Sequence, residues 1–186
     1  MTGNRQQQTE GRKQAEKSCS SPAFSLLPSE IEAIKAEAEH YEDSSAASIE
    51  ALKIVQKNRG WISDESLKAI AALLGMGAAE LEGVATFYNL IYRRPVGETV
   101  IHYCDSVSCW MLGADKVRKH FCKRLGIELG ETTEDGKFTL LPIVCLGACD
   151  RAPVVMVGES THFDVDEASV DRILASKNED REVDDG

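Results

Sequence analysis

The sequence predicts an α+β protein in which a small N-terminal helical bundle precedes an α/β domain. Apolar residues recur at helical spacing through residues 25–95, which is typical of packed amphipathic helices. After residue 95, short alternating segments typical of strands are interleaved with helical ones. The chain has 186 residues, of which 42% are hydrophobic, so it is long and apolar enough for a sizeable core.

Four helical segments are expected in residues 25–95. Ser29 and Glu32 form a potential capping box for the first segment, Gly60 ends the second, and Ser63 caps the third. Short links between the segments favour a bundle. The apolar stripes that should form its core are Ile31, Ile34, Ala38 and Tyr41, then Ile49, Leu52 and Val55, then Leu67, Ile70 and Leu74, and finally Leu81, Val84 and Tyr88.

The α/β domain is expected in residues 96–176. Three strands are predicted in "TVIHY", "KFTLLPIV" and "PVVMVG", and two helices in "GADKVRKHFCKRLG" and "DEASVDRILAS". The second of these helices has Asp166 as its potential cap. On the first, Val117, Phe121 and Leu125 share one side. We expect disordered tails in residues 1–24 and in the acidic residues 177–186.

Composition limits the classes of function. The formal net charge is −10, with 31 acidic and 21 basic residues, which argues against nucleic-acid binding. No apolar run approaches the roughly 18 residues of a membrane span, and the polar N-terminus does not resemble a secretory signal. We therefore expect a cytoplasmic protein. In that reducing compartment, the six cysteines favour metal binding or redox chemistry over structural disulfides.

Four of the cysteines form two pairs, each at the end of a predicted strand. Cys104 and Cys109 bracket "DSVS", and Cys145 and Cys149 bracket "LGA". Residues five apart lie ~140° apart around a helix and on opposite faces of a strand, so the first pair should lie on a loop if both sulfurs serve one centre. Loops at neighbouring strand ends can meet. The two pairs therefore predict a cage of four thiolates.

Ligand number and spacing leave the occupant of this cage open. Structural zinc accepts four thiolates and similar spacings. An iron–sulfur cluster also takes four thiolates, and C-x4-C is half of the plant-type ferredoxin spacing, which favours a [2Fe–2S] cluster. A thiol redox site is the third alternative, although the chain lacks a C-x-x-C motif.

Several motifs together resemble the thioredoxin-like [2Fe–2S] ferredoxin family, the ferredoxin subunits of respiratory NADH–quinone oxidoreductase (complex I). They are "CDSVSC", "GETTEDGKFTL" and "CLGACDRAP", with "NRGWIS" and "GVATFYNLIY" upstream. The resemblance covers about residues 28–175. It implies a thioredoxin-like α/β domain with one [2Fe–2S] cluster, held by Cys104, Cys109, Cys145 and Cys149.

The resemblance also implies a function and partners. This chain would exchange single electrons with FMN on an adjacent flavoprotein subunit that also binds NADH, and it would contact a larger iron–sulfur subunit through that partner. It would be a subunit of a proton-translocating NADH:quinone oxidoreductase, with no complete active site of its own and no membrane insertion. As part of the complex it would lie on the cytoplasmic face of the inner membrane. The corresponding subunit of an NAD-linked hydrogenase or formate dehydrogenase is the alternative within the family. A zinc-stabilised interaction module and a thioredoxin-like thiol oxidoreductase are alternatives from other classes.

The remaining cysteines, His102 and several polar residues near the cysteine pairs are not expected to be cluster ligands. Cys19 and Cys122 match no ligand of the family, and His102 is expected to be a strand residue. Ser106 and Ser108 are potential hydrogen-bond donors to sulfur, while Lys116 and Arg151 are potential counter-charges or ordinary surface charges. The sequence contains neither a G-x-G-x-x-G motif after a strand nor a Walker loop, so nucleotides are expected on a partner subunit.

Overall fold

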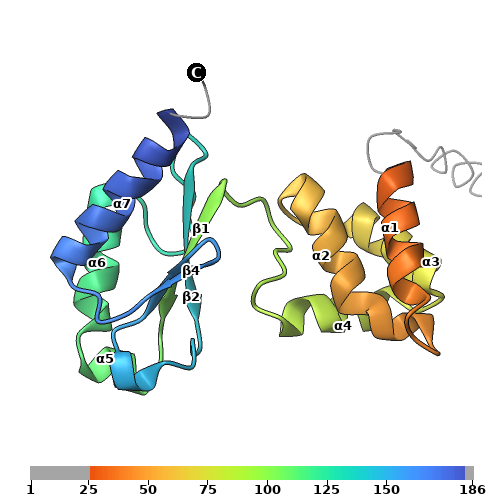
Figure 1. Cartoon of the computed structure of the whole chain (residues 1–186), viewed down its shortest axis with the longest axis horizontal. Coiled ribbons are helices and arrows are strands. Elements are labelled where there is room, and N and C mark those ends of the chain that lie inside the picture. Colours follow the sequence, from red (N-terminus) through yellow and green to blue (C-terminus); the bar gives the residue numbers. More distant parts are fainter. Residues whose placement is uncertain (1–25, 183–186) are drawn as a thin grey trace, which may run out of the picture.

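The computed structural model describes residues 26–182, with side chains described through Lys177. Its helices and strands form two units joined by an extended linker, a helical bundle and a mixed sheet with helices (Figure 1). The predicted α+β architecture is confirmed. The tail predicted at residues 1–24 lies outside the described residues, as do residues 183–186.

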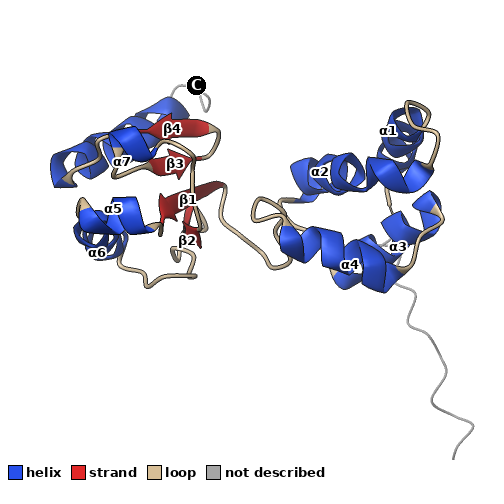
Figure 2. Ribbon diagram, turned by 90° about the horizontal axis from the view of Figure 1, so that it is seen from below, coloured by secondary structure: helices blue, strands red, loops and turns tan. Residues whose placement is uncertain are grey.

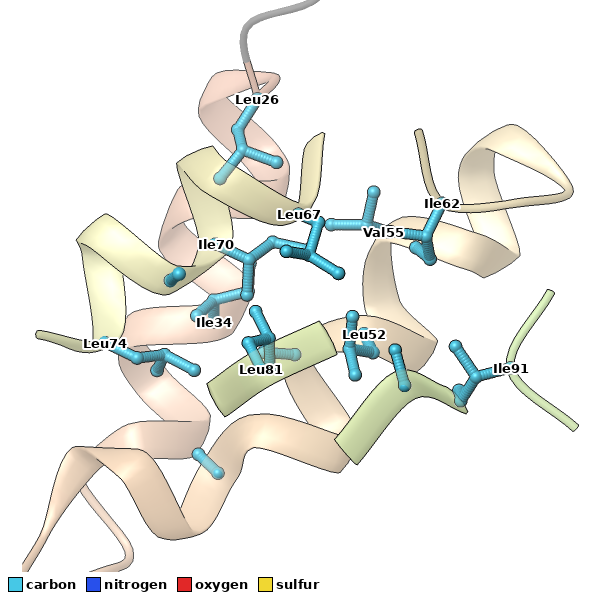
Figure 3. Close-up of a cluster of buried hydrophobic side chains, with 14 residues drawn as sticks. Leu26, Ile34, Leu52, Val55, Ile62, Leu67, Ile70, Leu74, Leu81 and Ile91 are labelled. Atoms are coloured by element: carbon cyan, nitrogen blue, oxygen red, sulfur yellow. The ribbon is translucent and has the colours of Figure 1, made fainter. Parts of the chain in front are cut away.

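The bundle contains four α-helices and a short 3-10 helix around one apolar core. These elements are α1 (Pro28–Ala38), η2 (Ser44–Ala47), α2 (Ser48–Arg59), α3 (Asp64–Leu74) and α4 (Ala78–Phe87). Figure 3 shows side chains from all four α-helices meeting in the middle of the bundle. Ile34, Leu52, Ile70 and Leu81 are fully buried there, as their helical spacing predicts.

The predicted start of the first helix is wrong. The helix begins at Pro28, because proline suits the first helical position, and Glu30 rather than Glu32 accepts a hydrogen bond from the Leu27 N–H at 2.8 Å. The helix also ends at Ala38, so Tyr41 lies beyond it and is exposed, as is Tyr88 after α4. The predicted caps at Gly60 and Ser63 are confirmed.

No single helix among residues 26–182 has both the length and the apolar composition needed to cross a membrane. The consecutive helices α3 and α4 meet those requirements only when taken together, and they are bent by 115° relative to each other.

The second unit is built on a four-stranded sheet with the order β2-β1-β3-β4, drawn in red in Figure 2. Its strands are β1 (Thr99–Cys104), β2 (Phe138–Ile143), β3 (Val155–Val157) and β4 (Ser160–His162). β1 pairs in parallel with β2 and antiparallel with β3, so β1 is a central strand. Cys104 is aligned with Ile143, which places the carboxyl ends of β1 and β2 at one edge of the sheet.

Helices cover one face of this sheet. α6 (Ala114–Leu125) and α7 (Glu167–Glu182) pack against each other on the same side, with the short helix α5 (Val107–Met111) near one end (Figure 1). Phe121 from α6 meets Ile101 of β1 and Leu140 of β2 in the buried core of this unit. The apolar stripe predicted for α6 therefore faces the sheet.

Three features of this unit differ from the prediction. β4 and α5 are additional elements, each too short to leave a clear periodic signal. α7 continues to Glu182, whereas disorder was predicted from residue 177. Once the first turns of α7 are formed and packed, each further residue adds one backbone hydrogen bond at little cost. The prediction of disorder used only the acidic composition and did not include this effect. The cap predicted at Asp166 is confirmed by its 2.8 Å hydrogen bond from the Ser169 N–H.

Candidate functional site: four thiols at one end of the sheet

The first cysteine pair lies where β1 ends. Cys104 is the last residue of β1, and Cys109 lies within α5, so the segment is a strand end and a helical turn rather than the simple loop that the spacing predicted. Two residues, Asp105 and Ser106, change the chain direction between the two elements. This turn allows residues five apart to face one centre. Both side chains are buried, at 1% exposure.

The second pair follows β2. Cys145 comes two residues after the end of β2, and Cys149 begins a short 3-10 helix, η3 (Cys149–Arg151). Between them, Gly147 has a positive φ of 79°, which glycine adopts without the steric cost of a side chain. Both cysteines are exposed, in contrast to the first pair.

The four thiols are close enough to affect one another's ionisation. Cys104 raises the pKa of Cys109, and Cys149 and Cys104 both lower the pKa of Cys145. The sulfurs of Cys145 and Cys149 are 3.9 Å apart. Two thiolates bound to one tetrahedral metal at ~2.3 Å would be about 3.8 Å apart, so the spacing of this pair suits a shared metal ion.

The parallel pairing of β1 with β2 brings the two pairs to the same end of the sheet unit. Among residues 26–177, no three His, Cys, Asp or Glu side chains are grouped so that they could hold one metal ion. A binuclear cluster needs only two protein thiolates on each iron, because bridging sulfides complete each coordination shell. Four thiols in two adjacent pairs are a donor set that fits such a cluster.

The surroundings of the thiols differ between the two pairs. Burial raises the pKa of the Cys109 thiol to about 11, and the neighbouring Cys104 thiol acts in the same direction. The Gly147 N–H, which donates to the Cys145 sulfur at 3.3 Å, lowers the pKa of Cys145. The hydrogen bond with Cys145 raises the pKa of Cys149. The second pair is therefore the more polar side of the site.

Hydrogen-bond donors reach the sulfurs from several segments. The Ser106 hydroxyl lowers the pKa of Cys145, and the Ser108 hydroxyl acts on Cys149 in the same direction, so the first cysteine segment stabilises the thiolates of the second. Val154, which no sequence pattern singled out, contributes its backbone to the first pair. Its carbonyl accepts from the Cys104 N–H at 3.1 Å, and its N–H donates to the Cys109 sulfur.

The remaining candidates lie in different surroundings. Cys122 is half-buried on α6, where burial raises its pKa, and Cys19 lies outside the described residues. Arg151 lies 4.1 Å from the Phe163 ring centre and 3.3 Å from an Asp164 oxygen, so a neighbouring carboxylate balances its charge. Lys116 is exposed on α6.

His102 is buried in β1, where the sequence placed it. Both ring nitrogens lack a hydrogen-bond partner among the described residues, and burial lowers the pKa of His102 to about 4. Its imidazole is therefore neutral at neutral pH. It is stacked with Tyr92, with ring centres 6.0 Å apart.

An apolar rim, which the sequence did not predict, lies beside the thiols. We define it as the exposed side chains of α5 and its C-terminal end, with one residue next to Cys145: Val107, Trp110, Met111, Leu112 and Val144. The run "WML" directly after Cys109 was an available signal. Large apolar groups at 60–74% exposure beside a potential cofactor site are typical of a binding surface.

Comparisons with known proteins match most of this chain. The sequence profile of the thioredoxin-like [2Fe–2S] ferredoxin family matches residues 34–178. A subunit of NADH-quinone oxidoreductase from Pseudomonas aeruginosa is 52% identical over 151 residues, which cover 81% of this chain and 91% of that protein. The corresponding subunit of the Escherichia coli NADH-quinone oxidoreductase is 52% identical over 152 residues, with 82% and 92% coverage.

A solved structure supports the fold. The NAD+-reducing [NiFe]-hydrogenase in its air-oxidised state matches with a TM-score of 0.61 and 21% identity. The match covers 74% of this chain but only 24% of the hydrogenase chain, and it concerns the fold alone. The profile match and the identity to the two bacterial proteins extend over most of the sequence. This chain belongs to the thioredoxin-like [2Fe–2S] ferredoxin family.

Proposed function

We propose that this chain is the [2Fe–2S] electron-transfer subunit of an NADH–quinone oxidoreductase, respiratory complex I. The bacterial relatives that carry the name of that oxidoreductase share about half of their residues with it along nearly their whole length. The observation that carries the proposal is that the parallel pairing of β1 with β2 brings Cys104 and Cys109 to the same end of the sheet as Cys145 and Cys149. When bound there, the cluster supplies one-electron chemistry.

We infer that Cys104, Cys109, Cys145 and Cys149 hold the cluster. Cys104 and Cys109 are buried against Ala114, Ala152 and Val154, and these apolar neighbours exclude water from one side of the site. Cys145 and Cys149 lie toward solvent, where N–H and hydroxyl donors reach their sulfurs. Such donors offset the negative charge that thiolates and an added electron bring to the site.

The partner that we propose is a flavoprotein subunit carrying FMN and the NADH site, with the larger iron–sulfur subunit reached through it. The apolar rim supports a protein partner at this end, because it exposes large uncharged side chains on α5 and next to Cys145. Contact there would also remove water from the more polar side of the site. As part of the complex, the chain would be peripheral on the cytoplasmic face of the membrane.

The first test is spectroscopic and uses the full chain purified without oxygen. We expect a brown protein with two irons and two sulfides per chain, and one S = 1/2 EPR signal after reduction with dithionite. Bound zinc with no EPR signal would instead support the zinc-stabilised module and overturn the proposal. Reduction of insulin disulfides in the presence of dithiothreitol would support the thiol oxidoreductase.

The second test assigns the ligands by cysteine-to-serine substitution. Each single replacement of Cys104, Cys109, Cys145 or Cys149 should either abolish the cluster or change its EPR signal. The reason is that serine oxygen is a harder ligand than thiolate. Replacement of Cys122 or Cys19 should leave iron content and spectrum unchanged. Loss of the cluster in Cys122→Ser would show that the ligand assignment is wrong.

A third test separates the respiratory complex from the hydrogenase alternative. The chain, expressed with an affinity tag in its own host, should co-purify with an FMN-containing subunit and with NADH–quinone reductase activity. Hydrogenase or formate dehydrogenase activity in the purified complex would support the alternative instead.

A further inference from the structure

The linker between the two units is held at both of its ends. On the bundle side, Arg93 pairs with Asp64 at 2.6 Å and with Glu82 at 2.8 Å. On the sheet side, the Gly97 N–H donates to the Thr139 hydroxyl at 2.6 Å. Only residues 94–96 lie between these two anchors. The relative placement of the two units therefore depends on three linker residues and on direct contacts between the units.

The helices of the bundle pack on one another, and the strands and helices of the sheet unit do the same. Every pair of helices and strands in substantial contact lies within the bundle or within the sheet unit. Figure 1 shows the two units side by side with only the linker between their ribbons. A side-chain contact that crosses this space therefore has a large influence on how the two units are oriented.

Tyr92 makes such a contact, because its backbone belongs to one unit and its ring to the other. Its N–H donates to the Gln56 side chain at 2.7 Å, and its carbonyl accepts from the Ile62 N–H at 2.8 Å, so the bundle fixes its backbone. Its ring stacks on His102 of β1 with 18° between the ring planes. Gln56 also donates to the Leu90 carbonyl at 2.7 Å, which holds the preceding turn of chain.

His102 is suited to receive this ring. It is 1% exposed and lies between Leu141 of β2 and Met156 of β3 on the neighbouring strands. Because neither ring nitrogen has a hydrogen-bond partner among the described residues, packing against apolar and aromatic neighbours is the interaction it makes. Aromatic pairs at this separation stabilise beyond the apolar area that they bury.

We propose that the stacking of Tyr92 on His102 fixes the orientation of the helical bundle relative to the cluster-bearing unit. The bundle and the site at the end of β1 then form one preorganised surface, since His102 lies two residues before Cys104 on the same face of the same strand. This inference concerns the two units themselves and does not depend on the electron-transfer role.

The experiment measures the distance between the units in the full chain by double electron–electron resonance. Genetically encoded spin labels at positions 68 on α3 and 123 on α6, both exposed lysines, leave every cysteine intact. We expect one narrow distance distribution for the unsubstituted chain and for Tyr92→Phe, which keeps the ring. Tyr92→Ala should lose the narrow peak and give a broad or shifted distribution.

A matched control and a second variant make the result decisive. Tyr41→Ala removes an exposed tyrosine from the bundle and should leave the distribution unchanged. If Tyr92→Ala does not accumulate as folded protein, Tyr92→Leu is measured instead. Leucine keeps most of the apolar volume but has no aromatic ring to stack. A narrow, unshifted distribution in folded Tyr92→Ala or Tyr92→Leu would overturn the proposal. A broad distribution in Tyr92→Phe would show that the hydroxyl, rather than stacking, fixes the orientation.

Discussion

At the scale of single residues, the hydroxyls between the first two cysteines link both halves of the site. Ser106 and Ser108 belong to the segment that bears Cys104 and Cys109, yet their hydroxyls act to lower the pKa of Cys145 and Cys149. A hydroxyl donor stabilises a sulfur more strongly as negative charge accumulates on it. These two serines should therefore favour the reduced state of a bound cluster.

Ser106→Ala and Ser108→Ala should each lower the midpoint potential of the cluster. If one hydrogen bond contributes about 1 kcal/mol more to the reduced state, the shift is about 40 mV for a single electron. A redox titration followed by EPR measures it. Ser45→Ala in the bundle is the matched control and should leave the potential unchanged. Equal potentials in all three variants would contradict the role of the hydroxyls.

At the scale of elements, a buried ion pair joins α1 to α2. The Glu30 side chain is fully buried and accepts from Arg59 at 2.7 and 3.0 Å and from the Leu27 N–H at 2.8 Å. Burial by itself would raise the pKa of Glu30, but the hydrogen bonds from Arg59 and Leu27 and the charge of Arg59 outweigh it and lower that pKa. The carboxylate thus stays ionised inside the bundle.

Arg59→Met should destabilise the protein by about 3–5 kcal/mol, because it leaves the buried Glu30 carboxylate without its ionic partner. Urea unfolding followed by circular dichroism measures the free energy. Lys53→Met removes one partner of the exposed Glu50–Lys53 pair and should change stability by less than about 1 kcal/mol. Similar losses in the two variants would contradict the importance of burial.

The same pair predicts a pH dependence of stability. The pKa of Glu30 is lower in the folded than in the unfolded state, so its contribution is complete above the unfolded value near 4.5. It should decrease as the pH falls from there through the lowered pKa. Urea unfolding between pH 3 and pH 6 should show a weaker acid dependence for Glu30→Gln than for the unsubstituted chain. Parallel pH profiles would contradict the assignment.

The contact of the linker with the sheet unit makes another element-scale prediction. A Cβ at Gly97 would lie 2.8 Å from the Gly136 carbonyl oxygen, so Gly97→Ala must displace backbone and should cost about 1–3 kcal/mol. Gly83 lies within α4 with nothing within 4 Å of its potential Cβ. Gly83→Ala should therefore stabilise by about 0.5–1 kcal/mol. Thermal unfolding compares the two, and a stabilised Gly97→Ala would contradict the close approach.

At the scale of the whole molecule, the site and the apolar rim lie at one end of the sheet unit, while the bundle extends to the side of the sheet that faces away from α6 and α7 (Figure 1). The surface around the exposed cysteine pair is thus left open by the chain itself. A large indole at 65% exposure in such a place is a typical anchor for a protein partner.

Trp110→Glu should weaken binding to the flavoprotein subunit by about 2 kcal/mol, which is on the order of 30-fold in affinity. Surface plasmon resonance with the partner of the same host measures it, and the EPR signal checks that the cluster is retained. Ser160→Glu is the control, because the turn between β3 and β4 follows Val157, which is aligned with Ile101, and so lies at the opposite end of the sheet from Cys104. Equal affinities in both variants would contradict docking at the rim.

Local signals in the chain were sufficient to locate the longer helices, the central strands and the two cysteine pairs. Helical stripes, the caps at Ser63 and Asp166 and the alternation in β1 act over a few residues, so they can be read without the fold. Family motifs then indicated the nature of the cofactor. The short elements α5 and β4 were missed, because they contain too few residues for a period to emerge.

Tertiary structure decided which groups meet. The alignment of β1 with β2 brings Cys104 and Cys145 to one edge, although 40 intervening residues separate them in "CDSVSC … VCLGAC". Likewise, the pairing of Glu30 with Arg59 and the stacking of Tyr92 on His102 join residues that no periodic pattern relates. Such contacts depend on how elements pack, and packing is determined by the whole chain rather than by any segment of it.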